Sequence, residues 1–167
     1  MKLEPFYELD VVLVCGLPAS GKSHFSRRFF NRDGRKRVNR KEIRRNLHQM
    51  TEFGQEWKEE YFDNSDEGLV KHVERRILEH LLHSGQRVLV DNTSVSVASR
   101  KSYLALARQM RKSIGIVFIN TPLKLCIQRN SRRTQHVPDV IIANLAAAVE
   151  LPRPEEGFDE LLIINEY

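Results

Sequence analysis

The sequence has little cysteine and no long apolar segment. Its two cysteines, Cys15 and Cys126, lie in short apolar runs and lack the spacing of a metal site. We therefore expect both to be reduced core residues, which predicts a cytoplasmic or other reducing intracellular compartment. The first ten residues carry three acidic side chains and no apolar block, unlike a signal peptide or a membrane span, so we expect no membrane partner.

Internal repeats, low-complexity tracts and linkers are also lacking. A length of 167 residues is typical of one domain, and a hydrophobic content of 41% is enough for a core at this length. We therefore expect a single domain over residues 1–167. The oligomeric state stays open.

A phosphate-loop pattern, G-x-x-x-x-G-K-S, follows the apolar run Val11–Val14 and precedes an amphipathic segment. Strand, loop and helix in this order are the setting in which the pattern binds phosphate. Gly16 and Gly21 permit backbone conformations that a side chain would obstruct, so that successive N–H groups can point at phosphate oxygens. Lys22 can reach the β- and γ-phosphates, and the Ser23 hydroxyl can bind Mg²⁺. The predicted ATP-binding residues here are Gly16, Leu17, Pro18, Ala19, Ser20, Gly21, Lys22 and Ser23.

Apolar strands alternate with helices along the chain, which predicts an α/β fold whose parallel sheet has helices on both faces. The expected strands are Val11–Val14, Arg37–Asn39, Arg87–Asp91, Ile114–Ile119 and Leu161–Ile164. The expected helices are Gly21–Phe30, Arg40–Met50, Asp66–Leu82, Val97–Met110, Pro122–Asn130 and Pro138–Val149. Ligands of such sheets bind beyond the carboxyl ends of the strands. We therefore expect Gly16, Asn39, Arg40, Asp91 and Asn120 to converge there.

Two segments between these strands carry further patterns. In the helix expected over Asp66–Leu82, apolar residues recur at helical spacing at Leu69, Val73, Ile77 and Leu81. The segment Thr51–Ser65 is polar, aromatic and irregular. Its aromatic side chains could stack on a base, but packing is the simpler interpretation.

The charge of the chain is unevenly distributed. The net charge is +5, and ten Lys or Arg residues fall within Arg27–Arg45 against Asp33 and Glu42. Such a run can be a solvated surface or a contact for a polyanion, and the sequence leaves both open.

Two further features suit phosphoryl transfer. Asp91 closes the strand V-L-V-D, where a carboxylate could hold hydrated Mg²⁺ or orient a nucleophile, although it could also cap the following turn. Arg129, Arg132 and Arg133 lie on and just after a helix that should cross the site. Their planar guanidinium groups suit phosphate oxygens, which predicts an arginine lid in the C-terminal half, with an exposed helix end as the alternative.

Taken together, these motifs resemble the polynucleotide 5′-hydroxyl kinases of bacteriophages and eukaryotic DNA repair. Those enzymes belong to a wider group of P-loop kinases with tRNA-directed and zeta-toxin-like members. The resemblance covers nearly the whole chain, and it is the ordered set of motifs that is specific. The set comprises G-L-P-A-S-G-K-S (16–23), V-N-R-x-x-I-R (38–44), V-L-V-D-N-T (88–93) followed by Ala98-Ser99-Arg100, R-N-S-R-R (129–133), H-V-P (136–138) and P-E-E-G-F (154–158).

The resemblance implies ATP and Mg²⁺ as cofactors and the 5′ end of DNA or RNA as the partner. It places Arg129 and Arg133 on the donor phosphates, and it implies no second domain here, since D-x-D-x-T is lacking. The residues assigned to the acceptor are Arg40, Arg44 and Asp91; those assigned to catalysis are Lys22, Glu42, Asp91 and Arg133; those assigned to Mg²⁺ are Ser23 and Asp91.

One position departs from the family. Its general base is an aspartate directly after N-R, where this chain has Lys41. A lysine cannot accept a proton unless its pKa is strongly depressed. Three explanations stay open: Glu42 or Asp91 takes the role, no base is needed, or the acceptor or the activity has changed. We favour the first.

The sequence therefore predicts ATP-dependent phosphorylation of a 5′-hydroxyl end. Two alternatives remain: a kinase of a small hydroxyl compound, and a nucleotide-binding module that transfers little. The preference for DNA or RNA is open.

Overall fold

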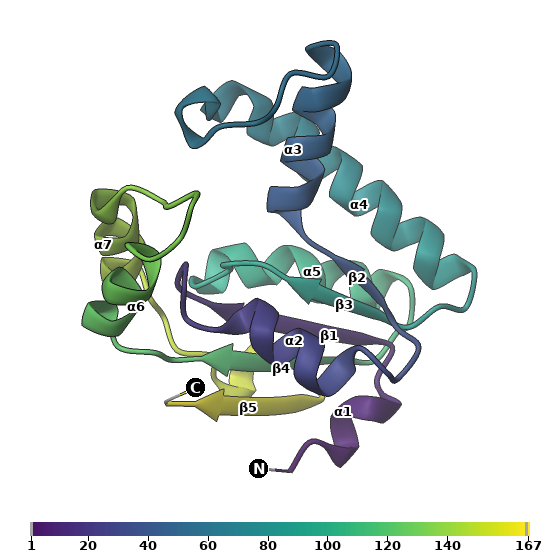
Figure 1. The fold of residues 1–167 in the computed structure, drawn as a ribbon. Coiled ribbons are helices and arrows are strands. Elements are labelled where there is room, and N and C mark those ends of the chain that lie inside the picture. The colour runs from purple at the N-terminus through teal and green to yellow at the C-terminus, as the bar shows by residue number, and fades with distance from the viewer. Residues whose placement is uncertain (1, 166) are drawn as a thin grey trace.

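One five-stranded parallel sheet forms the centre of the molecule (Figure 1). The computed structural model describes residues 2–165 and 167. The strands lie in the order β2-β3-β1-β4-β5, and every neighbouring pair is parallel. Their bounds are β1 Val11–Gly16, β2 Lys36–Val38, β3 Val88–Asp91, β4 Ile114–Ile119 and β5 Glu160–Ile164. The expectation of a parallel α/β fold is confirmed.

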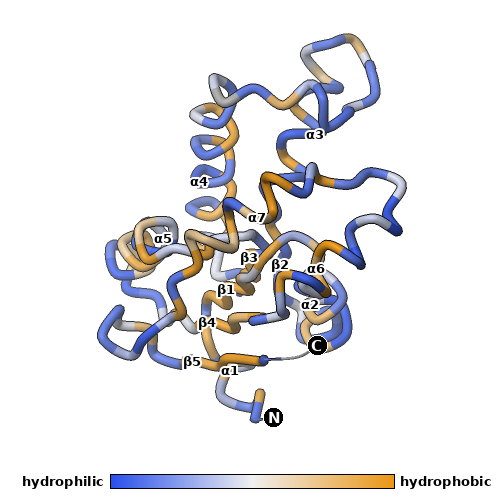
Figure 2. The backbone as a smooth tube through the Cα atoms, turned by 90° about the vertical axis from the view of Figure 1, so that its left-hand side faces the viewer, coloured by the Kyte–Doolittle hydropathy of each residue, from blue (hydrophilic) through white to orange (hydrophobic). Residues whose placement is uncertain are grey.

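Helices cover both faces of this sheet. They are α1 Glu4–Glu8, α2 Lys22–Phe30, α3 Arg40–Thr51, α4 Glu67–His83, α5 Val97–Gln109, α6 Leu123–Asn130 and α7 Asp139–Ala147. In β1, Leu13 and Cys15 face a core that α4 to α7 close, whereas Val12 and Val14 face a second core under α1 and α2. Burial on both faces explains why the strand is apolar throughout, with no alternation. Figure 2 shows these hydrophobic strands at the centre of the molecule.

The second strand ends one residue earlier than expected. Asn39 caps α3: its side chain accepts a hydrogen bond from the Glu42 backbone N–H at 3.1 Å. A residue with this role begins the helix instead of continuing the strand. The cap therefore positions the start of α3 directly beyond the carboxyl end of β2.

The buried face of α4 differs from the expected one by one residue. The buried positions are Val70, Glu74, Leu78 and Leu82, whereas Leu69 and Ile77 are 51% and 36% exposed. The difference arises at Glu74, an acidic residue that is only 2% exposed. Polar partners inside the protein compensate its burial, so the helix turns this side chain inward.

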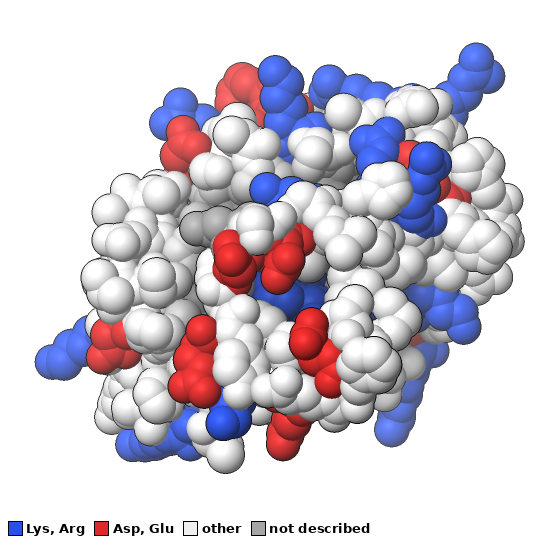
Figure 3. Space-filling model, turned by 90° about the horizontal axis from the view of Figure 1, so that it is seen from above, with Lys and Arg blue, Asp and Glu red and all other residues white. Residues whose placement is uncertain are grey.

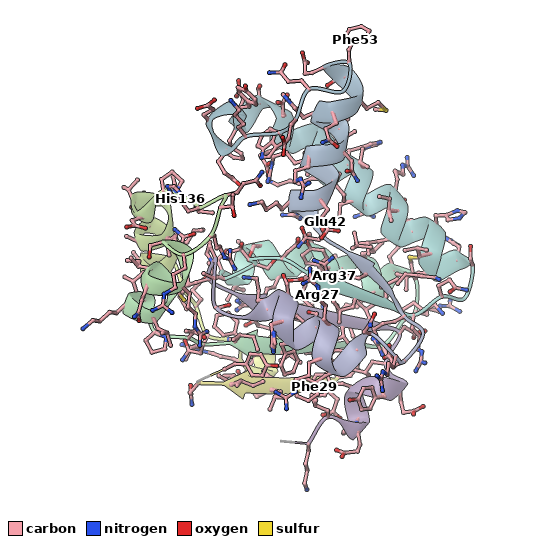
Figure 4. All side chains as sticks on the ribbon, viewed as in Figure 1. Arg27, Phe29, Arg37, Glu42, Phe53 and His136 are labelled. Carbon is pink, nitrogen blue, oxygen red and sulfur yellow. The ribbon has the colours of Figure 1, made fainter. Side chains whose placement is uncertain are left out.

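Helix α3 projects away from the sheet, and the segment after it folds back toward α4 (Figure 1). Trp57 is buried there and packs edge-on against His48, which stacks on Tyr61. For these two aromatic residues the packing interpretation is confirmed. Phe53 is different: it lies fully exposed at the tip of the projection (Figure 4).

A buried ion pair joins two of the motifs. Arg100 of α5 is fully buried, and its Nε and Nη2 atoms donate to Glu156 at 2.8 and 2.6 Å. Its Nη1 atom donates to the carbonyls of Val95 and Glu150. These bonds tie the loop after β3 to the turn before β5, a structural role.

The two cysteines are free and buried, as expected. Among the residues that the structure describes, no helix is both long and apolar enough to cross a bilayer.

Candidate active site

A cleft of about 1220 Å³ opens beyond the carboxyl ends of β1, β2 and β3. Helix α3 lines one side of it, and α6 with the start of α7 lines the other (Figure 1). Because β3 lies next to β1, the end of β3 comes beside the phosphate loop. The cleft therefore joins the loop to the first turn of α3 and to Asp91.

The phosphate loop has the backbone that its glycines were expected to permit. Gly16 and Gly21 have φ values of 144° and 106°, and a Cβ atom on Gly16 would clash with the Ile119 carbonyl oxygen. Ser20 is fully buried, yet its Oγ has no hydrogen-bond partner among the described residues. Pro18, Ala19, Gly21, Lys22 and Ser23 line the cleft; Gly16, Leu17 and Ser20 form the buried base of the loop. The loop is thus a preformed concave cradle.

The Lys22 ammonium lies against the loop itself. Its Nζ donates to the Leu17 carbonyl at 2.6 Å. The pKa of Lys22 is lowered to about 8, mainly by burial, which Asp91 opposes and to which Arg133 adds a smaller contribution. A cation in this environment is favoured by an anion bound in the cradle.

Asp91 lines the cleft, and one of its two carboxylate oxygens has no partner among the described residues. Its side chain is 1% exposed, and Oδ2 accepts hydrogen bonds from Arg37 Nε at 3.1 Å and Nη2 at 2.9 Å. Oδ1 has no partner among the described residues. A buried carboxylate oxygen without a donor is costly, so a bound group that supplies one would be stabilised here.

The position of the family's base is occupied by an ion pair. Lys41 contacts Glu59 of the turn Glu59–Tyr61, and the lysine is therefore engaged as a cation. The next residue, Glu42, is half exposed, and its Oε1 accepts from Arg37 Nη1 at 2.7 Å. Figure 4 shows Arg37 and Glu42 close together at the start of α3.

A buried polar network fixes the start of α3 to the end of β3. Glu74 accepts hydrogen bonds from Arg40 Nε at 2.6 Å, from Asn92 Nδ2 at 2.5 Å and from the Tyr103 hydroxyl at 3.0 Å. Asn92 Oδ1 accepts from the Arg40 backbone N–H. The N-R and D-N-T motifs thus meet through Glu74 and Tyr103. Sequence reasoning missed both residues, because neither stands next to a motif.

The remaining acceptor-side residue, Arg44, also carries internal contacts. Arg44 pairs with Glu67 of α4 and lies 5.0 Å from the ring centre of Phe62. All of these side chains line the cleft. A bound anion would therefore meet Arg44 already held in place by its neighbours.

Two of the arginines that the sequence predicts as a lid line the opposite wall of the cleft. Arg129 Nη1 donates to the Ser20 carbonyl at 3.4 Å, and Arg133 lines the cleft beyond it. Buried Asn130 bonds to both backbone groups of Val137, at 2.7 and 3.1 Å, and so fixes the connection between α6 and α7. Arg132, which was expected beside them, is instead exposed and lies outside the cleft lining.

The basic run Arg27–Arg45 divides between two roles. Arg35 is buried and donates to the Phe6 and Val88 carbonyls, a structural function. Seven others line the cleft: Arg27, Arg28, Arg37, Arg40, Lys41, Arg44 and Arg45. Asn120 does not join them, contrary to expectation, because it pairs with Asn165 at the end of β4.

Positive charge is concentrated in this cleft. Ten Lys or Arg residues line it against four Asp or Glu residues, an excess larger than the net +5 of the whole chain. Seen from above, basic and acidic side chains lie together around a hollow near the middle of the face (Figure 3). The rest of the molecule is thus close to neutral, so the basic character belongs to the site.

The chain is similar in sequence to known proteins. The chain is 24% identical over 149 residues to the L-seryl-tRNA(Sec) kinase of Methanococcus maripaludis, a match covering 89% of this chain and 56% of that protein. It therefore spans just over half the length of this relative.

Two solved structures share the fold. A chain of the Pnkp1/Rnl/Hen1 RNA repair complex has a TM-score of 0.67 at 20% identity, covering 83% of this chain and 43% of that one. An unliganded sugar kinase from Janibacter sp. HTCC2649 has a TM-score of 0.66 at 15% identity, covering 92% and 83%. A family model of the AAA domain, AAA_33, matches residues 11–152. With most of its length matched and the phosphate loop, Asp91, Arg129 and Arg133 in one cleft, the chain belongs to the AAA_33 family of AAA domains.

Proposed function

We propose that this protein transfers the γ-phosphate of ATP to a hydroxyl group carried by a nucleic acid. The observation that carries the proposal is the charge of the cleft, in which ten cationic side chains face four acidic ones. MgATP neutralises only part of this excess. A polyanionic acceptor accounts for the remainder, because its phosphates are attracted to the same cations.

The donor half of the site fits ATP and Mg²⁺. The glycine-rich cradle, the unpartnered Ser20 Oγ and the Lys22 ammonium suit the triphosphate, and Ser23 lies where its hydroxyl would hold the metal ion. Bound Mg²⁺ would neutralise charge on the β- and γ-phosphates. Lys22 would bind the same phosphates from the loop side, and Arg129 and Arg133 from the α6 side.

The acceptor half centres on Asp91. This residue lines the cleft, and its unpartnered Oδ1 is suited to accept a hydrogen bond from the attacking hydroxyl. Arg40 and Arg44, both in the first turns of α3, flank the approach and would bind a phosphate of the acceptor strand. Transfer of this kind depends mainly on positioning and charge stabilisation, which these side chains supply.

The first candidate acceptor is a 5′-hydroxyl end, on the strength of the motifs from 38–44, 88–93 and 129–138. The second is an aminoacyl hydroxyl on tRNA. A specific observation favours it: the similarity to L-seryl-tRNA(Sec) kinase extends over 89% of this chain.

A panel of acceptors tests the proposal. γ-Labelled ATP and Mg²⁺ would be supplied with a 5′-hydroxyl RNA, the same RNA with a 5′-phosphate, seryl-tRNA, and mononucleosides with simple sugars. Label on the 5′-hydroxyl RNA alone supports the first candidate. Label on seryl-tRNA that leaves the tRNA together with the amino acid supports the second. Label only on nucleosides or sugars, or none with intact ATP binding, contradicts the proposal.

A further inference from the structure

Arg37 lies between two carboxylates at the acceptor end of the cleft. It belongs to β2, and its side chain is 27% exposed. Two of its nitrogens, Nε and Nη2, donate to a single oxygen, Oδ2 of Asp91, at 3.1 and 2.9 Å. The third, Nη1, donates to Glu42 Oε1 at 2.7 Å. One guanidinium group therefore orients both side chains that could replace the missing base.

The two carboxylates differ in what they leave free. Glu42 is half exposed and points its oxygen at Arg37. Asp91 is buried, with Oδ2 held by Arg37, and its backbone carbonyl accepts from Asn39 Nδ2. These bonds hold Oδ2 and the backbone of Asp91 in place and leave Oδ1 alone without a partner among the described residues. Of the two, Asp91 is the one that lines the cleft with a buried acceptor oxygen left unpartnered.

We propose that Arg37 is a positioning residue that holds Asp91 so that Oδ1 receives the acceptor hydroxyl, with Glu42 as the second anchor of Arg37. This inference rests on the proposed function. Lys41 cannot serve instead, because it is paired with Glu59. The positive charge of Arg37 also reduces the repulsion between two carboxylates and the triphosphate that would bind beside them.

The step that this arrangement serves is balanced in atoms and charge. The acceptor hydroxyl oxygen forms a bond to the γ-phosphorus, and the bond from that phosphorus to the β–γ bridging oxygen breaks. ADP leaves with the bonding electrons, and the hydroxyl, oriented by its hydrogen bond to Asp91 Oδ1, gives up its proton to water. Arg37 touches neither reacting atom and acts only through Asp91.

Kinetics of Arg37→Met, with the acceptor identified by the panel above, test the inference. A misplaced catalytic group can cost about 100-fold in rate, so kcat should fall by about that factor while KM for ATP changes less than about twofold. Arg37→Lys keeps the charge but cannot give two bonds to one oxygen, and it should restore only part of kcat. Lys36→Met, an exposed neighbour on the same strand outside the cleft, is the matched control and should behave as wild type.

A double-mutant cycle separates positioning from a general loss of structure. If Arg37 acts through Asp91, adding Arg37→Met to Asp91→Asn should lower kcat no further. If thermal unfolding shows that Arg37→Met is not folded, Arg37→Lys takes its place in the cycle, both alone and combined with Asp91→Asn. The inference would be overturned if the two substitutions lowered kcat independently, so that their losses multiplied in the double variant. It would also be overturned if Arg37→Met alone kept a kcat within threefold of wild type. A wild-type protein that labels no acceptor would instead refute the proposed function itself.

Discussion

Lys22 is the side chain whose charge depends most on what occupies the phosphate loop. Its motif position was predictable from the sequence, because G-x-x-x-x-G-K-S fixes the order of strand, loop and helix.

The arrangement of Arg37 between Asp91 and Glu42 was not predictable from the sequence. Arg37 is one arginine in a basic run, and only the adjacency of β2 and β3 brings it to Asp91. Residue contacts that cross between strands carry no local sequence signal.

The lowered pKa of Lys22 makes ATP binding sensitive to pH. Burial sets the pKa of the free protein at about 8. Bound phosphate favours the ammonium form and raises this pKa, so the affinity should be constant below pH 8 and fall above it. We expect Kd for MgATP to rise by up to about tenfold per pH unit between pH 8 and 9.5, measured by calorimetry.

Lys22→Met is the control for this titration. It should bind MgATP more weakly at neutral pH and lose the pH dependence above pH 8. A wild-type Kd that stays constant up to pH 9.5 would contradict the assignment of Lys22.

At the scale of elements, α6 and α4 support the two walls of the cleft differently. The arginines at and just beyond the end of α6 belong to a readable motif, R-N-S-R-R, and the structure separates their positions. Arg129 and Arg133 line the cleft, and Arg132 does not. For α4 the pattern misled: the regular apolar spacing of Leu69 and Ile77 lies on the exposed side. A network that makes a buried Glu74 favourable cannot be read from helix periodicity.

The lid arginines should affect catalysis more than folding. Replacing Arg129 or Arg133 by Met removes a guanidinium from the charge that develops on the transferring phosphate, and we expect kcat to fall by about 100-fold. Arg132→Met removes the same charge from an exposed neighbour. It should leave kcat unchanged in the same steady-state assay; equal losses in all three variants would refute a lid role.

The buried network of α4 should affect stability. In Glu74→Gln, the Arg40 guanidinium loses its ion pair while Asn92 and Tyr103 keep a polar neighbour. Because Arg40 is partly exposed, we expect a loss of about 2 kcal/mol of unfolding free energy, measured by urea unfolding. On the same helix, Glu79 pairs with Arg75 and Arg76 at the surface. The Glu79→Gln variant should therefore have the same unfolding free energy as the wild type. Equal stability of the two variants would contradict the role given to Glu74.

The whole molecule combines a predictable fold with a charge distribution that only the structure reveals. The alternation of apolar strands and amphipathic helices was enough to predict the parallel sheet, and most expected elements begin and end within two residues of the observed ones. The net charge of +5 left open whether the basic run meets solvent or a polyanion. The folded structure resolves this question in part, because Arg35 is buried and ten other cationic side chains line one cleft.

Label transfer at two salt concentrations tests most directly whether the basic cleft binds a nucleic-acid acceptor. γ-Labelled ATP would be supplied with an equimolar mixture of a nucleic-acid acceptor and its corresponding mononucleoside, under conditions of low acceptor concentration. With about four phosphate contacts to a single strand, log affinity should fall with a slope of about −3 against log salt. We predict label on the nucleic acid at 50 mM salt and about 50-fold slower labelling at 200 mM. Label on the mononucleoside, or nucleic-acid labelling that is unaffected by salt, would contradict the account.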